Sequence, residues 1–267
     1  MMSAPAIDPN DYLNEDGSGL SFGRLLKMMR GQFFLPIAIF LTVILKVVSK
    51  LSGGRMAAVN AAARENRPVD PSTMPALGRQ VFQAMANQLP EFRFVRFFKR
   101  DTIGMRQEYS AVGLHSGGQV LAVCEWQQHM IVLPPDKVSP EREKSTEAST
   151  IEFVSFAGDL PVVTGSVPRE HMGAVGLYGD DVADIVMISN ERRLEEILTE
   201  HRRRIGGRNV AVMNEEGAVR LAHGYGIRVR DHFLGLGLLR PITEAELDKI
   251  QKGAERHAAR FRRYTAV

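Results

Sequence analysis

Cys124 is the one cysteine of the 267-residue chain and the first candidate for chemistry. His115 and His129 lie close to it in the sequence and could act as a base for a thiolate nucleophile. However, Cys124 alternates with Val120 and Trp126 in a run typical of one buried face of a strand. This pattern favours a buried structural cysteine. A single cysteine also excludes an intramolecular disulfide framework and a cysteine-rich zinc site.

A second set of candidates consists of acidic and imidazole side chains. Asp180, Asp181 and Asp184 stand at the start of a predicted helix, where Asp180 and Asp184 would share one face and could hold a hard cation. Helix capping explains the same pattern more simply. His223 and His232 flank a glycine-rich stretch. A hydrolase-like site would require these distant residues to converge in the fold.

Established catalytic and cofactor motifs are absent from the sequence. It contains no phosphate-binding Gly-x4-Gly-Lys-Ser/Thr loop, no Gly-x-Ser-x-Gly nucleophile elbow, no His-Glu-x-x-His pair and no calcium loop. The sequence therefore predicts no catalytic residue, no cofactor and no metal site.

Charge is distributed unevenly behind a net value of +3. Residues 73–200 carry 12 Lys and Arg against 18 Asp and Glu, whereas residues 201–267 carry 14 against 7. The basic end predicts binding to anionic lipid or to an acidic protein, and a solvated helix face is the alternative. Nucleic acid is an unlikely partner because few aromatic side chains accompany the arginines. The candidate anion-binding residues are Arg202, Arg203, Arg204, Arg256, Arg260, Arg262 and Arg263.

An apolar stretch near the N-terminus predicts membrane attachment. Residues 31–45 are uncharged, and the apolar character continues to Leu51, past Lys46 and Lys50. We expect one membrane-spanning helix over 24–51, in contact with the bilayer through 31–51. An interfacial or re-entrant helix, a buried helix and a cleaved signal are the alternatives. More basic residues follow the stretch than precede it, which favours a cytoplasmic C-terminal domain.

The remaining sequence divides into segments by composition. Residues 1–23 are expected to be a mobile polar leader and 52–72 a linker. Residues 73–240 are expected to form an α+β domain with an antiparallel or mixed sheet, followed by a basic C-terminal helix over 241–267.

Periodicity and turn residues place the elements inside that domain. Residues 134–150 are expected to be a surface loop. Expected strand pairs are 111–114 with 119–126, 151–156 with 160–165, and 210–213 with 218–221. A further strand is expected at 91–99, and helices at 77–89, from 178–181 onward, at 191–205 and at 244–263, the last opened by the capping box of Thr243 and Glu246.

The combination predicts a membrane-anchored protein whose α+β domain is a non-enzymatic scaffold, adaptor or sensor. The alternative is a membrane-tethered, hydrolase-like enzyme whose site is assembled from the distant histidines and aspartates. These two hypotheses differ in whether those side chains meet in the fold.

Overall fold

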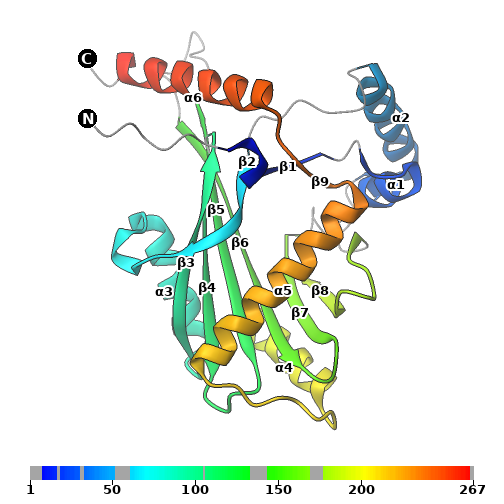
Figure 1. The fold of residues 1–267 in the computed structure, drawn as a ribbon. Coiled ribbons are helices and arrows are strands. Elements are labelled where there is room, and N and C mark those ends of the chain that lie inside the picture. The colour runs from blue at the N-terminus through cyan, green and yellow to red at the C-terminus, as the bar shows by residue number, and fades with distance from the viewer. Residues whose placement is uncertain are drawn as a thin grey trace.

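The structure is a computed structural model that describes residues 8–16, 19–30, 33–51, 61–104, 106–132, 143–168 and 177–264. Side chains of residues 130–132, 143–146 and 257–264 lie outside the described part. A long twisted sheet forms the centre of the molecule, with helices on both of its faces (Figure 1).

The sheet has nine strands in the order β8-β7-β6-β5-β4-β3-β2-β1-β9. Neighbouring strands are antiparallel except β7 and β8, which are parallel. The α+β class with a mixed sheet is therefore confirmed. The strands are β1 (Tyr12–Glu15), β2 (Ala61–Pro68), β3 (Phe92–Ile103), β4 (Arg106–His115), β5 (Leu121–Val132), β6 (Glu143–Phe156), β7 (Pro161–Val167), β8 (Asp184–Ser189) and β9 (Leu239–Pro241).

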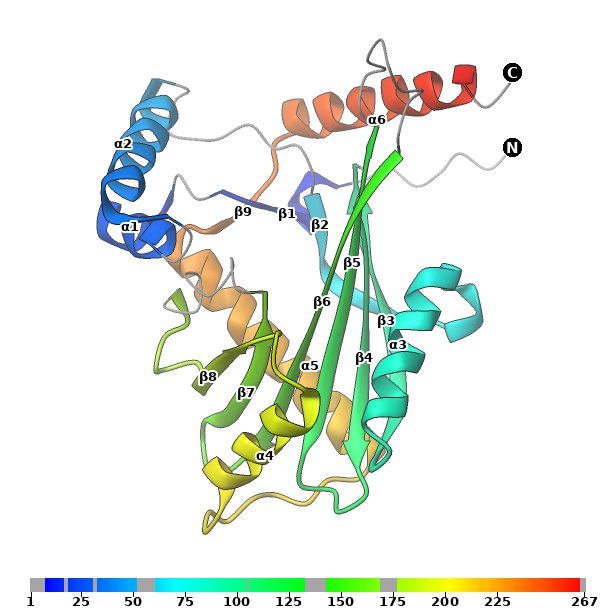
Figure 2. The same cartoon turned by 180° about the vertical axis from the view of Figure 1, so that it is seen from behind.

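One face of the sheet is covered by α3 (Ala76–Gln88) and α4 (Leu194–Ile205), which Figure 2 shows in front of the strands. The main core lies here, around Trp126, Cys124 and Phe153. Alternate residues of β5 face this core, as the sequence pattern predicts. The predicted pairs β4–β5 and β6–β7 are confirmed, with Ala111 opposite Cys124 in the first pair.

The opposite face is crossed diagonally by α5 (Glu215–Leu236) (Figure 1). The expected third strand pair at 210–213 and 218–221 is therefore wrong. Asn214 caps the helix instead, because its side-chain oxygen accepts a hydrogen bond from the Gly217 amide at 2.8 Å. At the other end, Gly237 adopts a left-handed conformation (φ 74°) that suits the helix C-terminus.

Two other expectations differ from the structure. The helix expected after residues 178–181 is a short turn followed by β8, which lies parallel to β7 and is half-buried. The loop expected at 134–150 is partly strand, because β6 already begins at Glu143 and pairs with β5. Residues 133–142 lie outside the described residues.

The start of the chain contributes to the sheet. β1 lies within the expected leader, yet it pairs with both β2 and β9, and the Arg240 guanidinium binds the buried Asp16 carboxylate at 2.6 Å. At the end of the chain, α6 (Glu244–Tyr264) begins at the expected capping box. The Glu246 amide donates to Thr243 Oγ1 at 3.2 Å, and the Thr243 amide donates to Glu246 Oε2 at 2.9 Å.

The single helix expected over 24–51 is wrong. The segment forms two helices, α1 (Phe22–Arg30) and α2 (Leu35–Leu51), which pack together and are called the N-terminal hairpin below. Pro36 lies in the first turn of α2, where its missing N–H leaves no hydrogen bond unmade. Within the described parts of the chain, no helix has both the length and the apolar character needed to span a bilayer.

Candidate functional site

A cavity of about 440 Å³ lies between α5 and the sheet. Its walls combine apolar side chains with an unusual number of ionisable ones. Side chains from β2 to β6, from α5 and from the segment before β8 line it. The ionisable or hydroxyl-bearing side chains that matter below are those of Arg100, Arg106, Glu108, Glu125, Glu152, Tyr178 and Tyr225.

Glu125 and Glu152 bring two carboxyl groups together on the floor of the cavity. Glu152 pairs in register with Val123, two residues before Glu125, so the two glutamates are diagonal neighbours on the face beneath α5. Glu125 is exposed and Glu152 is half-buried, and both side chains line the cavity. Neither carboxylate forms an ion pair within the described part of the chain.

Enclosure and mutual repulsion keep these carboxyl groups from ionising readily. Loss of water, followed by the negative charge of Glu125, raises the pKa of Glu152 to about 7. The pKa of Glu125 is also raised, mainly by desolvation and then by Glu108, although Arg100 and Arg106 oppose the rise. Near neutral pH the pair therefore holds a proton that it can exchange.

Tyr225 of α5 faces the two glutamates. The residue is only 7% exposed, and within the described residues its hydroxyl interacts with the Glu152 carboxyl without forming a hydrogen bond of normal geometry. Burial raises the pKa of Tyr225 well above its usual value, so the phenol is neutral. A buried hydroxyl that lacks a well-formed hydrogen bond costs free energy, and a bound ligand would reduce that cost.

Arginines near the pair are engaged elsewhere. The buried Glu108 carboxylate forms ion pairs with Arg106 and, at 3.6 Å, with Arg100. Arg100 also donates to the Ala63 carbonyl at 2.6 Å, and Arg106 reaches Glu15 at 3.6 Å. These partners occupy both guanidinium groups, which still act on Glu125 by opposing the rise of its pKa.

The predicted histidine and aspartate candidates come together only in part. His223 lines the cavity, whereas His232 donates through Nε2 to the Leu177 carbonyl at 2.9 Å. Asp181 lies 3.9 Å from His232 Nδ1. Asp184 is held by arginines of the opposite layer, and Asp180 is exposed. The four-residue constellation expected for the enzyme alternative is therefore not assembled.

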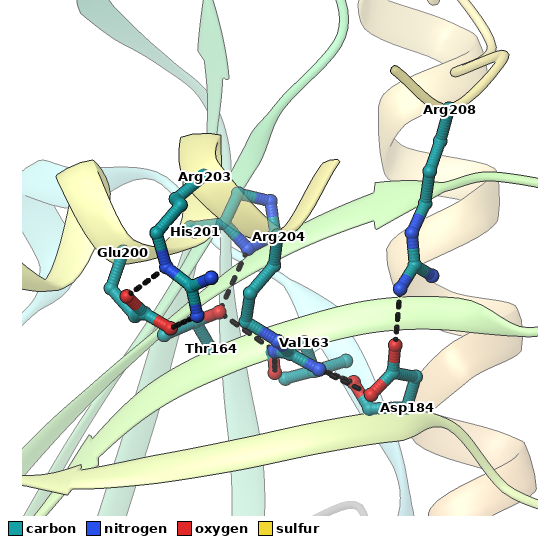
Figure 3. A network of polar contacts seen from close by, with 8 residues as sticks. All are labelled: Val163, Thr164, Asp184, Glu200, His201, Arg203, Arg204 and Arg208. Atoms are coloured by element: carbon teal, nitrogen blue, oxygen red, sulfur yellow. Dashed lines mark hydrogen bonds and ion pairs between the residues drawn. The ribbon is translucent and has the colours of Figure 1, made fainter. Parts of the chain in front are cut away.

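Arg202, Arg203 and Arg204 each contact acidic side chains of the protein. Arg202 binds Glu91, and Arg203 binds Glu200 at 2.6 Å. Arg204 is nearly buried and donates to the carbonyls of Val163 and Asp184 and to the Asp184 carboxylate, whose second oxygen is 3.0 Å from Arg208 (Figure 3). These contacts join α4 to β7 and β8.

On α6, the described part of the basic cluster is Arg256, which is exposed and donates to the Lys252 carbonyl at 3.1 Å. The side chains of Arg260, Arg262 and Arg263 lie outside the described residues. Binding of an anionic surface by the two basic clusters stays a prediction.

His201 on α4 is a buried titratable group that the sequence did not single out. Its Nε2 lies 2.9 Å from Ser155 Oγ and its Nδ1 lies 3.1 Å from Thr164 Oγ1. The Thr164 hydroxyl oxygen accepts a hydrogen bond from the Arg204 guanidinium (Figure 3), so the hydroxyl proton is donated to His201 Nδ1. Ser155 donates to the Gln119 carbonyl at 2.8 Å, so it accepts from Nε2 and is not a nucleophile. Desolvation, with a smaller effect of Arg204, lowers the pKa of His201 to about 4.

Cys124 is fully buried, and burial raises the pKa of its thiol far above the physiological range. It lies on the α3–α4 face of the sheet, away from the cavity. This placement agrees with a structural cysteine.

The N-terminal hairpin carries an apolar surface turned outward. Small or polar residues of α2, namely Ala38, Thr42 and Ser49, are buried. Large apolar residues are exposed, among them Phe40 (63%) and Leu51 (83%). Clusters of exposed large apolar side chains are typical of surfaces that contact a membrane or a partner.

The hairpin and the cavity share part of their support. Leu20, which precedes α1, and Leu25 of α1 pack in one cluster with Leu177 and Phe233. Leu177 and Phe233 also line the cavity. The two features are therefore in contact through the same side chains.

Sequence reasoning missed Glu125 and Glu152, although one signal was present. Each glutamate stands between apolar residues in a strand, at a position facing away from the main core. Recognising a cavity there requires knowing that α5 covers this face.

No family model and no curated protein matches the sequence, and no solved structure matches the fold. Function is therefore inferred from the cavity and the hairpin.

Proposed function

We propose that the protein attaches to one face of a lipid bilayer through the N-terminal hairpin and serves there as a non-enzymatic sensor or adaptor. The observation that carries this proposal is the reversed polarity of α2, which buries Ala38, Thr42 and Ser49 and exposes its large apolar side chains. A helix of a water-exposed surface shows the opposite pattern.

An anionic bilayer fits this surface better than a protein groove. Arg24, Lys27 and Arg30 are exposed on α1 at intervals of three residues, which places them near one another on that helix. A basic helix beside an apolar one suits a bilayer surface, where apolar side chains enter the acyl boundary and cations meet anionic headgroups. Arg256, Arg260, Arg262 and Arg263 on α6 would add to the same attraction.

The hairpin geometry supports an interfacial position in place of the spanning helix expected from the sequence. The cytoplasmic leaflet carries the anionic lipids, which favours the cytoplasmic face for this basic hairpin. The hydrolase-like alternative loses its main support, because Asp184 is paired with Arg204 and Arg208 instead of with His232.

Flotation of the full chain with vesicles tests the proposal. The protein is expected to float with phosphatidylcholine vesicles that contain phosphatidylglycerol, less with phosphatidylcholine alone, and less again at high salt. Protein that stays at the bottom of the gradient with both vesicle types would overturn the proposal. Alkaline carbonate should release the protein from membranes, whereas retention would favour a spanning segment.

A further inference from the structure

We propose that the cavity beneath α5 binds a small organic amine, with its ammonium group between the carboxyl groups of Glu125 and Glu152 and its apolar body along the wall formed by α5. This inference stands on the cavity and is independent of membrane attachment.

The first argument is that no side chain within the described residues forms an ion pair with the two carboxyl groups. Two carboxyl groups lie side by side in the wall of one cavity, and within the described residues neither forms an ion pair. Four arginines line the cavity. Arg100 and Arg106 are held by Glu108, and Arg230 is held by Asp231. The Nε of Arg64 has no hydrogen-bond partner within the described residues, but this guanidinium forms no ion pair there with Glu125 or Glu152. Two neighbouring carboxylates that lose part of their water beneath α5 repel each other, so a cation that enters between them is favoured.

The second, independent argument is the hydroxyl of Tyr225. This residue is more than nine-tenths buried and lines the cavity, and within the described residues its hydroxyl forms no hydrogen bond of normal geometry, although it lies beside the Glu152 carboxyl. A protonated amine has N–H donors for both glutamates and for the phenol oxygen. One ligand group can therefore contact both carboxyl groups and the phenol oxygen.

A metal ion fits the same pair poorly. Calcium requires six or more oxygen ligands, and magnesium six in octahedral order. Among the residues that the structure describes, no group of three or more His, Cys, Asp or Glu side chains could hold a metal. An ammonium group needs fewer and less regular partners, which agrees with two carboxyls and one phenol.

The apolar side of the cavity defines the rest of the ligand. Val123, Leu177, Ile227 and Phe233 contribute to the lining, and the volume of about 440 Å³ lies within the range of small-molecule sites. A short alkyl or aryl group attached to the amine would bury itself against these side chains. The expected ligand class is thus a hydrophobic monoamine.

Matched probes test this inference on the full chain by calorimetry at pH 8, where an alkylamine remains protonated. Phenethylamine is expected to bind at least tenfold more tightly than phenethyl alcohol, which has the same apolar body, and 3-phenylpropanoate is expected not to bind. Equal affinity for the amine and the alcohol, or no binding of the amine, would overturn the proposal.

Variants assign the binding to the paired glutamates. Glu125→Gln and Glu152→Gln should each weaken phenethylamine binding at least tenfold and leave the weak alcohol binding within twofold. Glu255→Gln, at an exposed position on α6, is the matched control and should change neither. Thermal melting of each variant establishes that it is folded. Amine binding that survives in the Glu125→Gln, Glu152→Gln double variant would show that the cavity carboxyls are not the site.

Discussion

Glu125 and Glu152 are diagonal neighbours on adjacent strands of one sheet face, and both line the cavity beneath α5. Two acidic side chains in such a position oppose folding unless one of them is protonated or a cation lies between them. Their placement therefore links the stability of the domain to pH and to ligand binding, and both links can be measured.

Glu152→Gln should stabilise the protein at alkaline pH. Because the pKa of Glu152 is raised from 4.5 to about 7 in the folded state, the wild-type protein loses stability as the pH rises from about 4.5 to 7. The variant avoids this loss, worth about 1–3 kcal/mol after allowance for cavity water. Urea denaturation at pH 5 and pH 8 measures the effect. If the variant and the wild type show the same difference between the two pH values, the raised pKa is refuted.

His201 should make the protein sensitive to acid. Its pKa is lowered from 6.5 to about 4 in the folded state, so the stability that it contributes is fully present above pH 6.5 and is lost as the pH falls towards 4. The loss amounts to about 3 kcal/mol. His201→Gln should be less stable at pH 7.5 and should lack this decline, as followed by denaturation curves between pH 4 and 7.5.

The exposed His223 provides the control for that experiment. His223→Gln should keep the wild-type decline in stability below pH 6.5. An unchanged decline in the His201 variant would assign acid sensitivity to other groups.

Arg204 and Arg203 are adjacent but should differ in their effect on stability. The Arg204 side chain is 8% exposed and binds two carbonyls and the Asp184 carboxylate, whereas the Arg203 side chain is 72% exposed and binds only Glu200. Arg204→Ala should cost about 2–4 kcal/mol, because it leaves buried acceptors unpaired. Arg203→Ala should cost about 0.5 kcal/mol or less. Chemical denaturation of both variants distinguishes them, and equal losses would contradict the role of Arg204 in joining α4 to the sheet.

Substitutions on α2 should abolish vesicle binding without unfolding the domain. Phe40→Ser with Leu51→Ser removes two exposed apolar side chains and should reduce flotation at least tenfold, since each such side chain contributes about 1.5–3 kcal/mol when buried in an apolar environment. Val212→Ser is the matched control, because Val212 is 72% exposed but lies outside the hairpin. Equal flotation of the double variant and the control would exclude α2 as the membrane contact.

Much of the sheet follows from sequence patterns that act locally. The alternation from Val120 to Trp126 correctly places one face of β5 against the core, and the capping box at Thr243 and Glu246 correctly begins α6. Both signals depend on residues a few positions apart.

Elements that depend on distant partners were predicted less well. Asp180, Asp181 and Asp184 suit a helix N-terminus, so the sequence predicts a helix here. In the structure Asp184 begins β8, which is a strand because it pairs with β7. The expected strand at 218–221 and the glycine-rich stretch after it both belong to α5, which packs on the sheet. The sequence alone does not show that Glu125 and Glu152 line one cavity, because that cavity exists only where α5 packs over the sheet.

The position of β1 has a consequence for the order of events during synthesis. Asn14 pairs with Arg240 on β9, so the outer part of this sheet edge cannot form until more than 220 further residues have left the ribosome. The apolar surface of α2 is made early and meets its surroundings before that edge is complete. Because contacts between distant residues form slowly, β1 and β9 are expected to join the sheet last. A nascent chain halted before Leu239 should therefore have an N-terminal hairpin that is already available to lipid or to chaperones, beside an unfinished sheet.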